Sequence, residues 1–349
     1  LTTQRRGDIT NEGVLRSQSD SDAGNTANGG DITLRTFQGN LLNQDALRAS
    51  SDTNAGNAGN GGNISLQADR GSITNENDLA TQSSTDDGDA GNGGKITLSA
   101  ASDISNQRLL NTYSFSESGT AQSGGDISIE STGGGSITNR GTFRSLSASN
   151  AGDAGNGGSI EMSTVAAGSI THYGALNAQS LANGNVTGNA MAGGDVTLTT
   201  DDGDIVLAPL RPVTSANENG GSINTRSVTR SGEAGNGGTI TVTSRGGNIV
   251  LNAYLDSKSY SLNGRSQSGG DISVTARAGS ITGNTINNNQ TNIVTSAVST
   301  ENSSNLEANA ISERDRGRRS GNVRLTARDS ISGFNIFTLA NQDDSGDVR

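Results

Sequence analysis

Six aspartates crowd two short segments of the chain and could supply oxygen ligands to a cation. They are Asp86, Asp87 and Asp89 in the first segment, and Asp201, Asp202 and Asp204 in the second. Carboxylate oxygens are the ligands that calcium prefers in proteins. The calcium-binding β-roll, however, repeats GGxGxD about every nine residues, and the repeat in this chain is more than three times longer. We keep calcium binding at these turns as a secondary hypothesis and expect folding to need no metal or cofactor.

Residues for acid–base or nucleophilic catalysis are few. The chain has no cysteine and one histidine, His172. Enzymes that cleave polysaccharides need carboxylates, arginine, lysine or histidine that converge on one face. His172 instead stands where other repeats of the chain carry asparagine, so we interpret it as a structural substitution. The sequence therefore predicts a protein that is not an enzyme.

Asparagine recurs at two places in the repeats. The first set is Asn11, Asn43, Asn75, Asn106 and Asn139, and the second set is Asn28, Asn60, Asn92, Asn156 and Asn236. Stacked amides can hydrogen-bond to one another along a column of parallel strands. Asparagine also suits turns with positive φ, which needs no ladder. We expect a hydrogen-bonded ladder for the first set, and both interpretations remain open for the second.

The composition excludes a core of large interlocking side chains. Of 349 residues 50 are glycine, aromatic residues make up 3%, and tryptophan and cysteine are absent. Such a composition is typical of disorder. The few isoleucine, leucine and valine residues are nevertheless placed periodically, which a disordered chain does not require. We therefore expect an ordered structure with a narrow core.

A six-residue motif, Gly-Gly-x-Ile-x-Leu and its variants, recurs along the chain. Its copies begin at Gly29, Gly61, Gly93, Gly124, Gly157, Gly193, Gly237 and Gly269. Each copy is followed by a GSITN-like segment, as at 71–75, and then by an LRASS-like segment, as at 47–51. All three segments alternate apolar and polar residues, which predicts three short β-strands in each repeat.

One repeat cannot bury its apolar face alone, so the repeats must stack. Parallel pairing of each strand with its equivalent in the next repeat produces a parallel β-helix, which we expect to be right-handed. The sequence predicts a single solenoid over residues 1–349, with about ten coils of roughly 32 residues and three strands in each coil.

The alternation also predicts which side chains point inward. In the first strand these are Ile32, Ile64, Ile96, Ile127, Ile160, Val196, Ile240 and Ile272, and in the second strand Ile73, Ile104, Ile137 and Ile170. The third strand places small residues inward, such as Ala49, Ser51, Thr81 and Ser83, so the interior there must be narrow. Loop insertions are predicted near 208–221, 284–292 and 298–320; the first contains both prolines, which cannot donate to a strand ladder.

The combination of GNGGxIxLxA, GSITN and LxAxS resembles the filamentous haemagglutinin-like proteins that two-partner secretion exports, in particular large cyanobacterial surface proteins. The resemblance covers essentially the whole chain. It implies export to the bacterial cell surface and a role as the shaft of an extracellular fibre or adhesin. A carbohydrate-binding or carbohydrate-active β-helix protein is the alternative.

Charge and hydropathy limit the partners. The net charge of -11 disfavours nucleic acid, whose phosphates need a basic surface. No apolar run approaches the roughly 18 residues that a membrane helix needs, so we expect no membrane insertion. Surface glycans remain candidate ligands.

The two ends of the chain match as consecutive parts of one repeat. Residues 346–349 (GDVR) followed by residues 1–3 (LTT) reproduce the pattern GDVTLTT of residues 194–200. The joined repeat would be about 33 residues long, which is within the normal range. We therefore expect the chain to continue head to tail into a copy of itself, either in one larger polypeptide or as stacked subunits.

Overall fold

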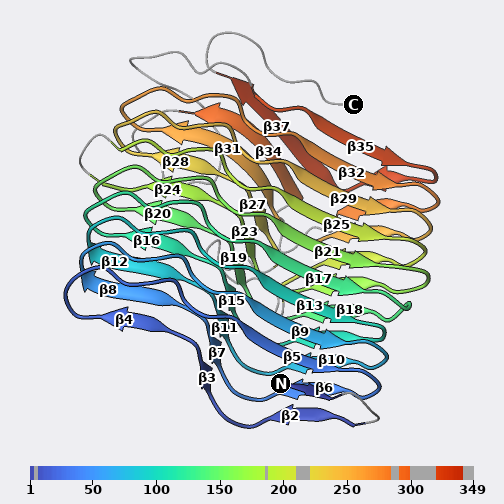
Figure 1. Cartoon of the computed structure of the whole chain (residues 1–349). Helices are drawn as coiled ribbons and strands as arrows, with labels where there is room; N and C mark the ends of the chain where they lie inside the picture. Colours follow the sequence, from blue (N-terminus) through green and yellow to red (C-terminus); the bar gives the residue numbers. More distant parts are fainter. Residues whose placement is uncertain (4–6, 185–187, 210–220, 284–290, 299–319, 341–349) are drawn as a thin grey trace.

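The computed structural model describes residues 1–3, 7–184, 188–209, 221–283, 291–298 and 320–340. These residues form β-strands and no helix. Figure 1 shows the chain winding through stacked coils, from the N-terminal coils in blue to the C-terminal coils in orange and red. Strands of successive coils pair in three parallel sheets, named A, B and C here. The predicted parallel β-helix is confirmed.

Sheets A and B contain ten strands each. Sheet A consists of β1 (Thr2–Thr3), β5 (Ile32–Thr36), β9 (Ile64–Ala68), β13 (Ile96–Ala100), β17 (Ile127–Ser131), β21 (Ile160–Thr164), β25 (Val196–Thr200), β29 (Ile240–Ser244), β32 (Ile272–Ala276) and β35 (Val323–Ala327). Sheet B consists of β2 (Ile9–Asn11), β6 (Leu41–Asn43), β10 (Ile73–Asn75), β14 (Ile104–Asn106), β18 (Ile137–Asn139), β22 (Ile170–His172), β26 (Ile205–Leu207), β30 (Ile249–Leu251), β33 (Ile281–Gly283) and β36 (Ile331–Ser332).

Sheet C has two rows of short strands that merge near the C-terminal end. The first row is β3 (Leu15–Arg16), β7 (Leu47–Arg48), β11 (Leu79–Ala80), β15 (Leu110–Asn111), β19 (Phe143–Arg144), β23 (Leu176–Asn177) and β27 (Ile223–Asn224). The second row is β4 (Ser19–Ser21), β8 (Ser51–Ala55), β12 (Ser83–Asp87), β16 (Ser114–Ser116), β20 (Ser147–Ser149), β24 (Ser180–Ala182) and β28 (Ser227–Thr229). The merged strands are β31 (Leu255–Ser261), β34 (Thr291–Val298) and β37 (Phe334–Ala340). The third predicted strand is therefore split in most coils.

Equivalent residues lie opposite one another in neighbouring coils. Ile64 pairs with Ile32 on one side and with Ile96 on the other. A shift of one residue would turn every apolar side chain of a strand to the opposite face. Because the register is kept, the predicted inward isoleucines and Val196 are all buried. Burial of each such side chain contributes roughly 1.5 to 3 kcal/mol.

The interior beneath sheet C is lined by small polar side chains, as the sequence predicts. Ser83 and Thr85 are fully buried on β12. The Thr85 hydroxyl donates to the carbonyl oxygen of Gly56 in the preceding coil at 2.8 Å, and the Ser116 hydroxyl donates to that of Gly88 at 2.7 Å. Buried hydroxyls therefore satisfy turn carbonyls that no strand ladder reaches.

Two predicted loop boundaries are wrong. Thr291, Asn292 and Val298, which lie within the predicted insertions at 284–292 and 298–320, belong to β34, which pairs with β31 and β37. The β-branched residues of TNIVTSAV are typical of a strand and outweigh the polar composition of the preceding residues. Residues 210–220, 284–290 and 299–319 of the predicted insertions, and residues 346–349 of the predicted head-to-tail junction, lie outside the described residues.

Candidate functional site

A ladder of amides runs along the inside of the coil stack, at the ends of the sheet B strands. Its members are Asn11, Asn43, Asn75, Asn106 and Asn139, which pair in register. Each Nδ2 donates to the Oδ1 of the next asparagine, at 2.7, 2.7, 2.6 and 2.6 Å in chain order. The structure thus brings together all five residues of the first predicted set.

Each of four amides in the ladder also holds the turn that follows its own strand. Asn75 Nδ2 also donates to the carbonyl oxygen of Asn77 at 2.6 Å, and Asn139 Nδ2 donates to that of Gly141 at 2.7 Å. Asn43 and Asn106 make the same contact two residues ahead. An amide has two donor hydrogens, so one fixes the neighbouring coil and the other fixes the turn from sheet B to sheet C.

His172 ends the ladder. Asn139 Nδ2 lies 2.7 Å from His172 Nδ1, and the direction of the ladder makes Nδ1 the acceptor. The ring proton then sits on Nε2, which is buried without a hydrogen-bond partner. Burial lowers the pKa of His172 to about 3, and the backbone of Gly174 offsets this only in part. The next residue in the column is Leu207, which cannot continue an amide ladder.

The second asparagine set makes a different kind of contact. Its side-chain oxygens accept backbone N–H groups of the next coil: Asn60 N–H donates to Asn28 Oδ1 and Asn92 N–H to Asn60 Oδ1, both at 2.8 Å. Asn156 and Asn236 accept the N–H groups of Ala192 and Ser268, both at 3.1 Å. These contacts join side chain to main chain, unlike the amide-to-amide bonds of the first set.

The aspartates considered as calcium ligands take part in similar contacts. Asp89 Oδ1 accepts the backbone N–H of Thr120 at 2.8 Å, and Asp204 Oδ1 accepts that of Asn248 at 2.7 Å. Asp201 forms an ion pair with Arg245 of the next coil.

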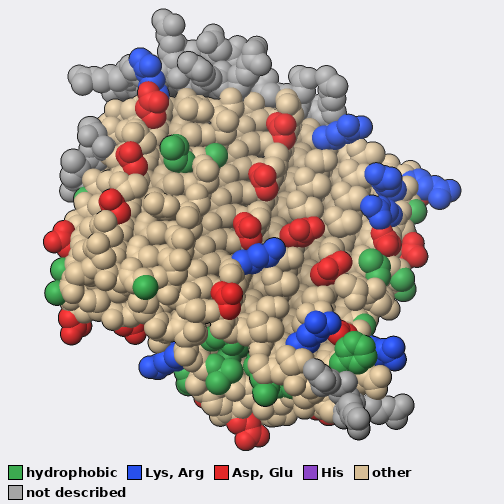
Figure 2. Space-filling view, in the orientation of Figure 1, with side chains coloured by type: hydrophobic (Ala, Val, Ile, Leu, Met, Phe, Trp, Pro, Cys, Tyr) green, Lys and Arg blue, Asp and Glu red, His purple; other side chains and the backbone are tan. Residues whose placement is uncertain are grey.

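The remaining three aspartates, Asp86, Asp87 and Asp202, are exposed. Asp87 Oδ1 accepts the hydroxyl of Ser118 at 3.0 Å. Within the described residues, no three acidic, histidine or cysteine side chains are grouped so as to hold a metal ion. Figure 2 shows charged side chains spread over the drawn face of the molecule, with no large patch of one sign.

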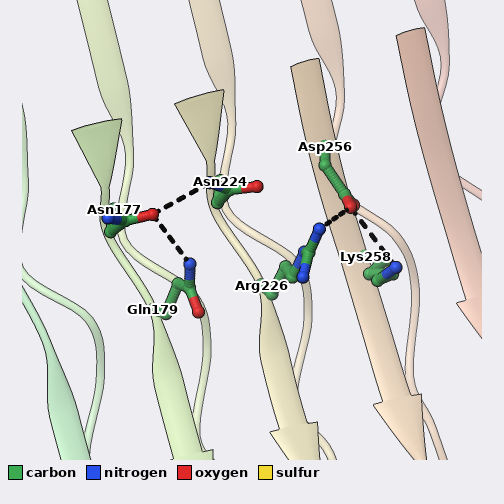
Figure 3. Close-up of polar contacts among 6 residues, drawn as sticks. All are labelled: Asn177, Gln179, Asn224, Arg226, Asp256 and Lys258. Atoms are coloured by element: carbon green, nitrogen blue, oxygen red, sulfur yellow. Dashed lines mark hydrogen bonds and ion pairs between the residues drawn. The ribbon is translucent and has the colours of Figure 1, made fainter. Parts of the chain in front are cut away.

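The outer face of sheet C carries a polar network that the sequence did not reveal. Figure 3 shows it across three neighbouring coils. Asn177 Oδ1 accepts hydrogen bonds from Asn224 Nδ2 at 2.8 Å and from Gln179 Nε2 at 3.2 Å. In the next coil Asp256 forms ion pairs with Arg226 and with Lys258, the latter at 3.3 Å.

Asp256 is only 5% exposed, and its ionisation depends on these two cations. Burial by itself would raise the pKa of Asp256, but the charges of Arg226 and Lys258 hold the pKa below its usual value. Burial and the nearby Arg226 lower the pKa of Lys258. Asp256 Oδ1 and Arg226 Nε have no hydrogen-bond partner and are buried. The network is therefore charged but incompletely satisfied.

An apolar column runs beside this network on the same outer face. It contains Phe115, Ala148, Leu181, Val228 and Tyr260, which pair in register. Tyr113, two residues before Phe115, stacks against it with ring centroids 5.4 Å apart and planes inclined by 15°. The sequence of each strand shows one of these residues at an outward position. Only the register of the coils shows that the five residues lie side by side.

No family model, no curated protein and no solved structure matches this chain. The part of the chain that the structure describes has no helix that is long and apolar enough to cross a membrane.

Proposed function

We propose that this chain is the structural shaft of an extracellular fibre or adhesin at the bacterial cell surface, exported by two-partner secretion. One observation supports the proposal: polar side chains of the chain form hydrogen bonds between successive coils. Amides join coils in the interior ladder, and asparagine and aspartate side chains join them at the turns. A protein built in this way resists separation of its coils along its axis.

The only histidine is consistent with this proposal. His172 is fully buried, and its Nδ1 accepts a hydrogen bond from the ladder. A general acid or base must reach a proton of the substrate directly or through one water molecule. His172 has no such access, which favours a structural protein over a carbohydrate-active enzyme.

The strands at both ends of the stack support continuation of the shaft. Among the residues that the structure describes, β1 and β35 are the edge strands of sheet A, and β2 and β36 are those of sheet B. Unpaired strand edges present free N–H and C=O groups that favour pairing with a further strand. We propose that coils continue head to tail at these edges, through the same polypeptide or through further copies.

Electron microscopy of the purified chain tests this proposal. Ten coils at roughly 4.8 Å each are about 48 Å long, so we expect rods whose lengths are multiples of about 48 Å. A denaturing gel of the material from its native source distinguishes the two versions, because a tandem chain migrates as one very large band and stacked subunits migrate near 35 kDa. Particles of a single short length at every concentration would contradict end-to-end stacking.

A further inference from the structure

Asparagine is followed directly by glycine at several places in the chain. The asparagines concerned are Asn28, Asn60, Asn92, Asn156, Asn183, Asn219, Asn236 and Asn263. Asparagine is a thermolabile residue. A following glycine increases this lability, because no Cβ hinders the approach of the glycine nitrogen to the asparagine side chain. Asn219 lies outside the described residues, and the structure gives the others different surroundings.

In the second asparagine set, one residue of the next coil holds both groups that would have to react. Asn92 donates its N–H to Asn60 Oδ1 at 2.8 Å, and its carbonyl oxygen accepts the N–H of Gly61 at 2.9 Å. The other four members of the set make the same pair of hydrogen bonds. The glycine nitrogen can reach the side chain only if the two coils open locally.

Asn183 and Gly184, in the turn after β24, lack both of these hydrogen bonds. Among the described residues, the side chain of Asn183 and the N–H of Gly184 have no hydrogen-bond partner. Asn183 is exposed, but so is Asn156 of the second set. Exposure therefore does not distinguish the two sites, whereas the hydrogen bonds to the next coil do.

A missing hydroxyl accompanies the free glycine N–H. In neighbouring coils the inward residue at the end of the same strand ties the turn: Ser149 Oγ accepts the N–H of Gly152 at 2.8 Å, and Ser261 Oγ accepts that of Gly264 at 2.9 Å. The equivalent residue in the coil of Asn183 is Ala182, which has no hydroxyl. The exposed Asn263, which precedes Gly264, is therefore an intermediate case, because only its glycine N–H is held.

We propose that Asn183 is a site of spontaneous deamidation in the folded chain, and that stacking of the coils protects the second asparagine set from the same reaction. The nitrogen of Gly184 forms a bond to Cγ of Asn183, and the Cγ–Nδ2 bond breaks. Nδ2 leaves as ammonia and takes the proton of the glycine N–H. One water molecule then opens the cyclic imide to aspartate or isoaspartate, which adds a negative charge beside β24. The inference does not depend on the proposed function.

Peptide mapping by mass spectrometry tests this on the wild-type chain, kept folded in mildly alkaline buffer. We expect Asn183 to deamidate at least about tenfold faster than Asn156, whose site must first lose two hydrogen bonds. We expect the rate at Asn263 to lie between these two. In urea, where no coils are stacked, the rates should converge. A folded chain in which Asn183 reacts no faster than Asn156 would overturn the proposal. A difference that persists in urea would also overturn it, because the local sequence would then be its cause.

The variant Ser261→Ala tests the protection directly, because it gives the turn of Asn263 the alanine that precedes Asn183. We expect deamidation of Asn263 to become roughly fivefold faster, since one hydrogen bond is lost. Ser259→Ala is the matched control: it removes another buried hydroxyl of β31, one that bonds to Ala234 and Gln267. Thermal melts show whether both variants are folded. Equal rates at Asn263 in the two folded variants would contradict protection by hydrogen bonding.

Discussion

At the scale of single residues, adjacent positions on one strand have opposite environments. Ile137 is 1% exposed within the core, and Thr138 points to solvent. Ile137→Asp would bury an unpaired carboxylate between two coils, which we expect to lower the free energy of unfolding by more than about 4 kcal/mol. Thr138→Ala is expected to change it by less than about 0.5 kcal/mol. Chemical denaturation of both variants measures the difference, and equal effects would contradict the assignment of the two faces.

His172 predicts how stability depends on pH. Its pKa is about 3 in the folded chain, against 6.5 for an ordinary histidine, so the unfolded chain binds the proton more tightly. Stability is therefore fully present above about pH 6.5 and falls as the pH decreases toward 3, by up to about 1.4 kcal/mol per pH unit. The lowered pKa of Asp256 acts only near and below its ordinary value of 3.8.

The variant His172→Asn isolates this effect. Asparagine at this position can accept the hydrogen bond from Asn139 and does not titrate. We expect urea denaturation between pH 4.5 and 6 to show a steep pH dependence for the wild type and a much shallower one for His172→Asn. A wild-type slope that persists in the variant would show that another group takes up the proton.

The acidic turns lead to a further prediction at this scale. Oδ1 of Asp89 and of Asp204 already accepts a backbone N–H of the next coil. We expect neither added calcium nor a chelator to shift the melting temperature of the purified chain. An increase in melting temperature with calcium that Asp87→Asn or Asp202→Asn abolishes would establish a calcium site at these turns.

At the scale of the elements, close approach of coils depends on the glycine pairs that precede the sheet A strands. A Cβ on Gly94 would overlap the carbonyl oxygen of Gly62 in the preceding coil, whereas a Cβ on Gly13 would meet nothing within 4 Å. Gly94→Ala must therefore push two coils apart at the point where β13 begins. We expect it to cost at least about 2 kcal/mol.

Gly13→Ala provides the control for this change in a solvent-facing turn. Because alanine restricts the unfolded chain more than glycine does, we expect Gly13→Ala to leave stability unchanged or slightly increased. Thermal denaturation of the two variants gives the comparison. A Gly94→Ala protein that melts with the wild type would mean that the coils can move apart without loss.

At the scale of the whole molecule, stability should vary along the stack. In a solenoid each coil contacts only its neighbours, so the end coils lack one interface. We expect amide hydrogens of the first coil, around Ile9, to exchange faster than those around Ile137 in the middle. Hydrogen exchange read by mass spectrometry measures this gradient. Protection of the first coil that grows as rods form would support end-to-end stacking, and uniform exchange along the chain would contradict a linear solenoid.

The sequence by itself determined the strands of sheets A and B, their register and the inward columns. This was possible because every coil offers nearly the same surroundings to equivalent residues, so that a pattern along the chain translates directly into a column in space. The first asparagine set illustrates the point: Asn43, Asn75 and Asn106 recur at equal places and form one ladder. The place of His172 in the same column was visible for the same reason, but that it ends the ladder was not.

Only the tertiary structure decided which groups of the neighbouring coil each side chain contacts. The second asparagine set bonds to backbone N–H groups because Asn60 Oδ1 faces the main chain of the next turn, a geometry that residue type does not specify. The apolar column with Leu181 and Val228 arises because residues from different coils come into register on the outer face. Alternation assigns each residue to a face of its own strand, but the chemistry of a face depends on the coils that lie beside it.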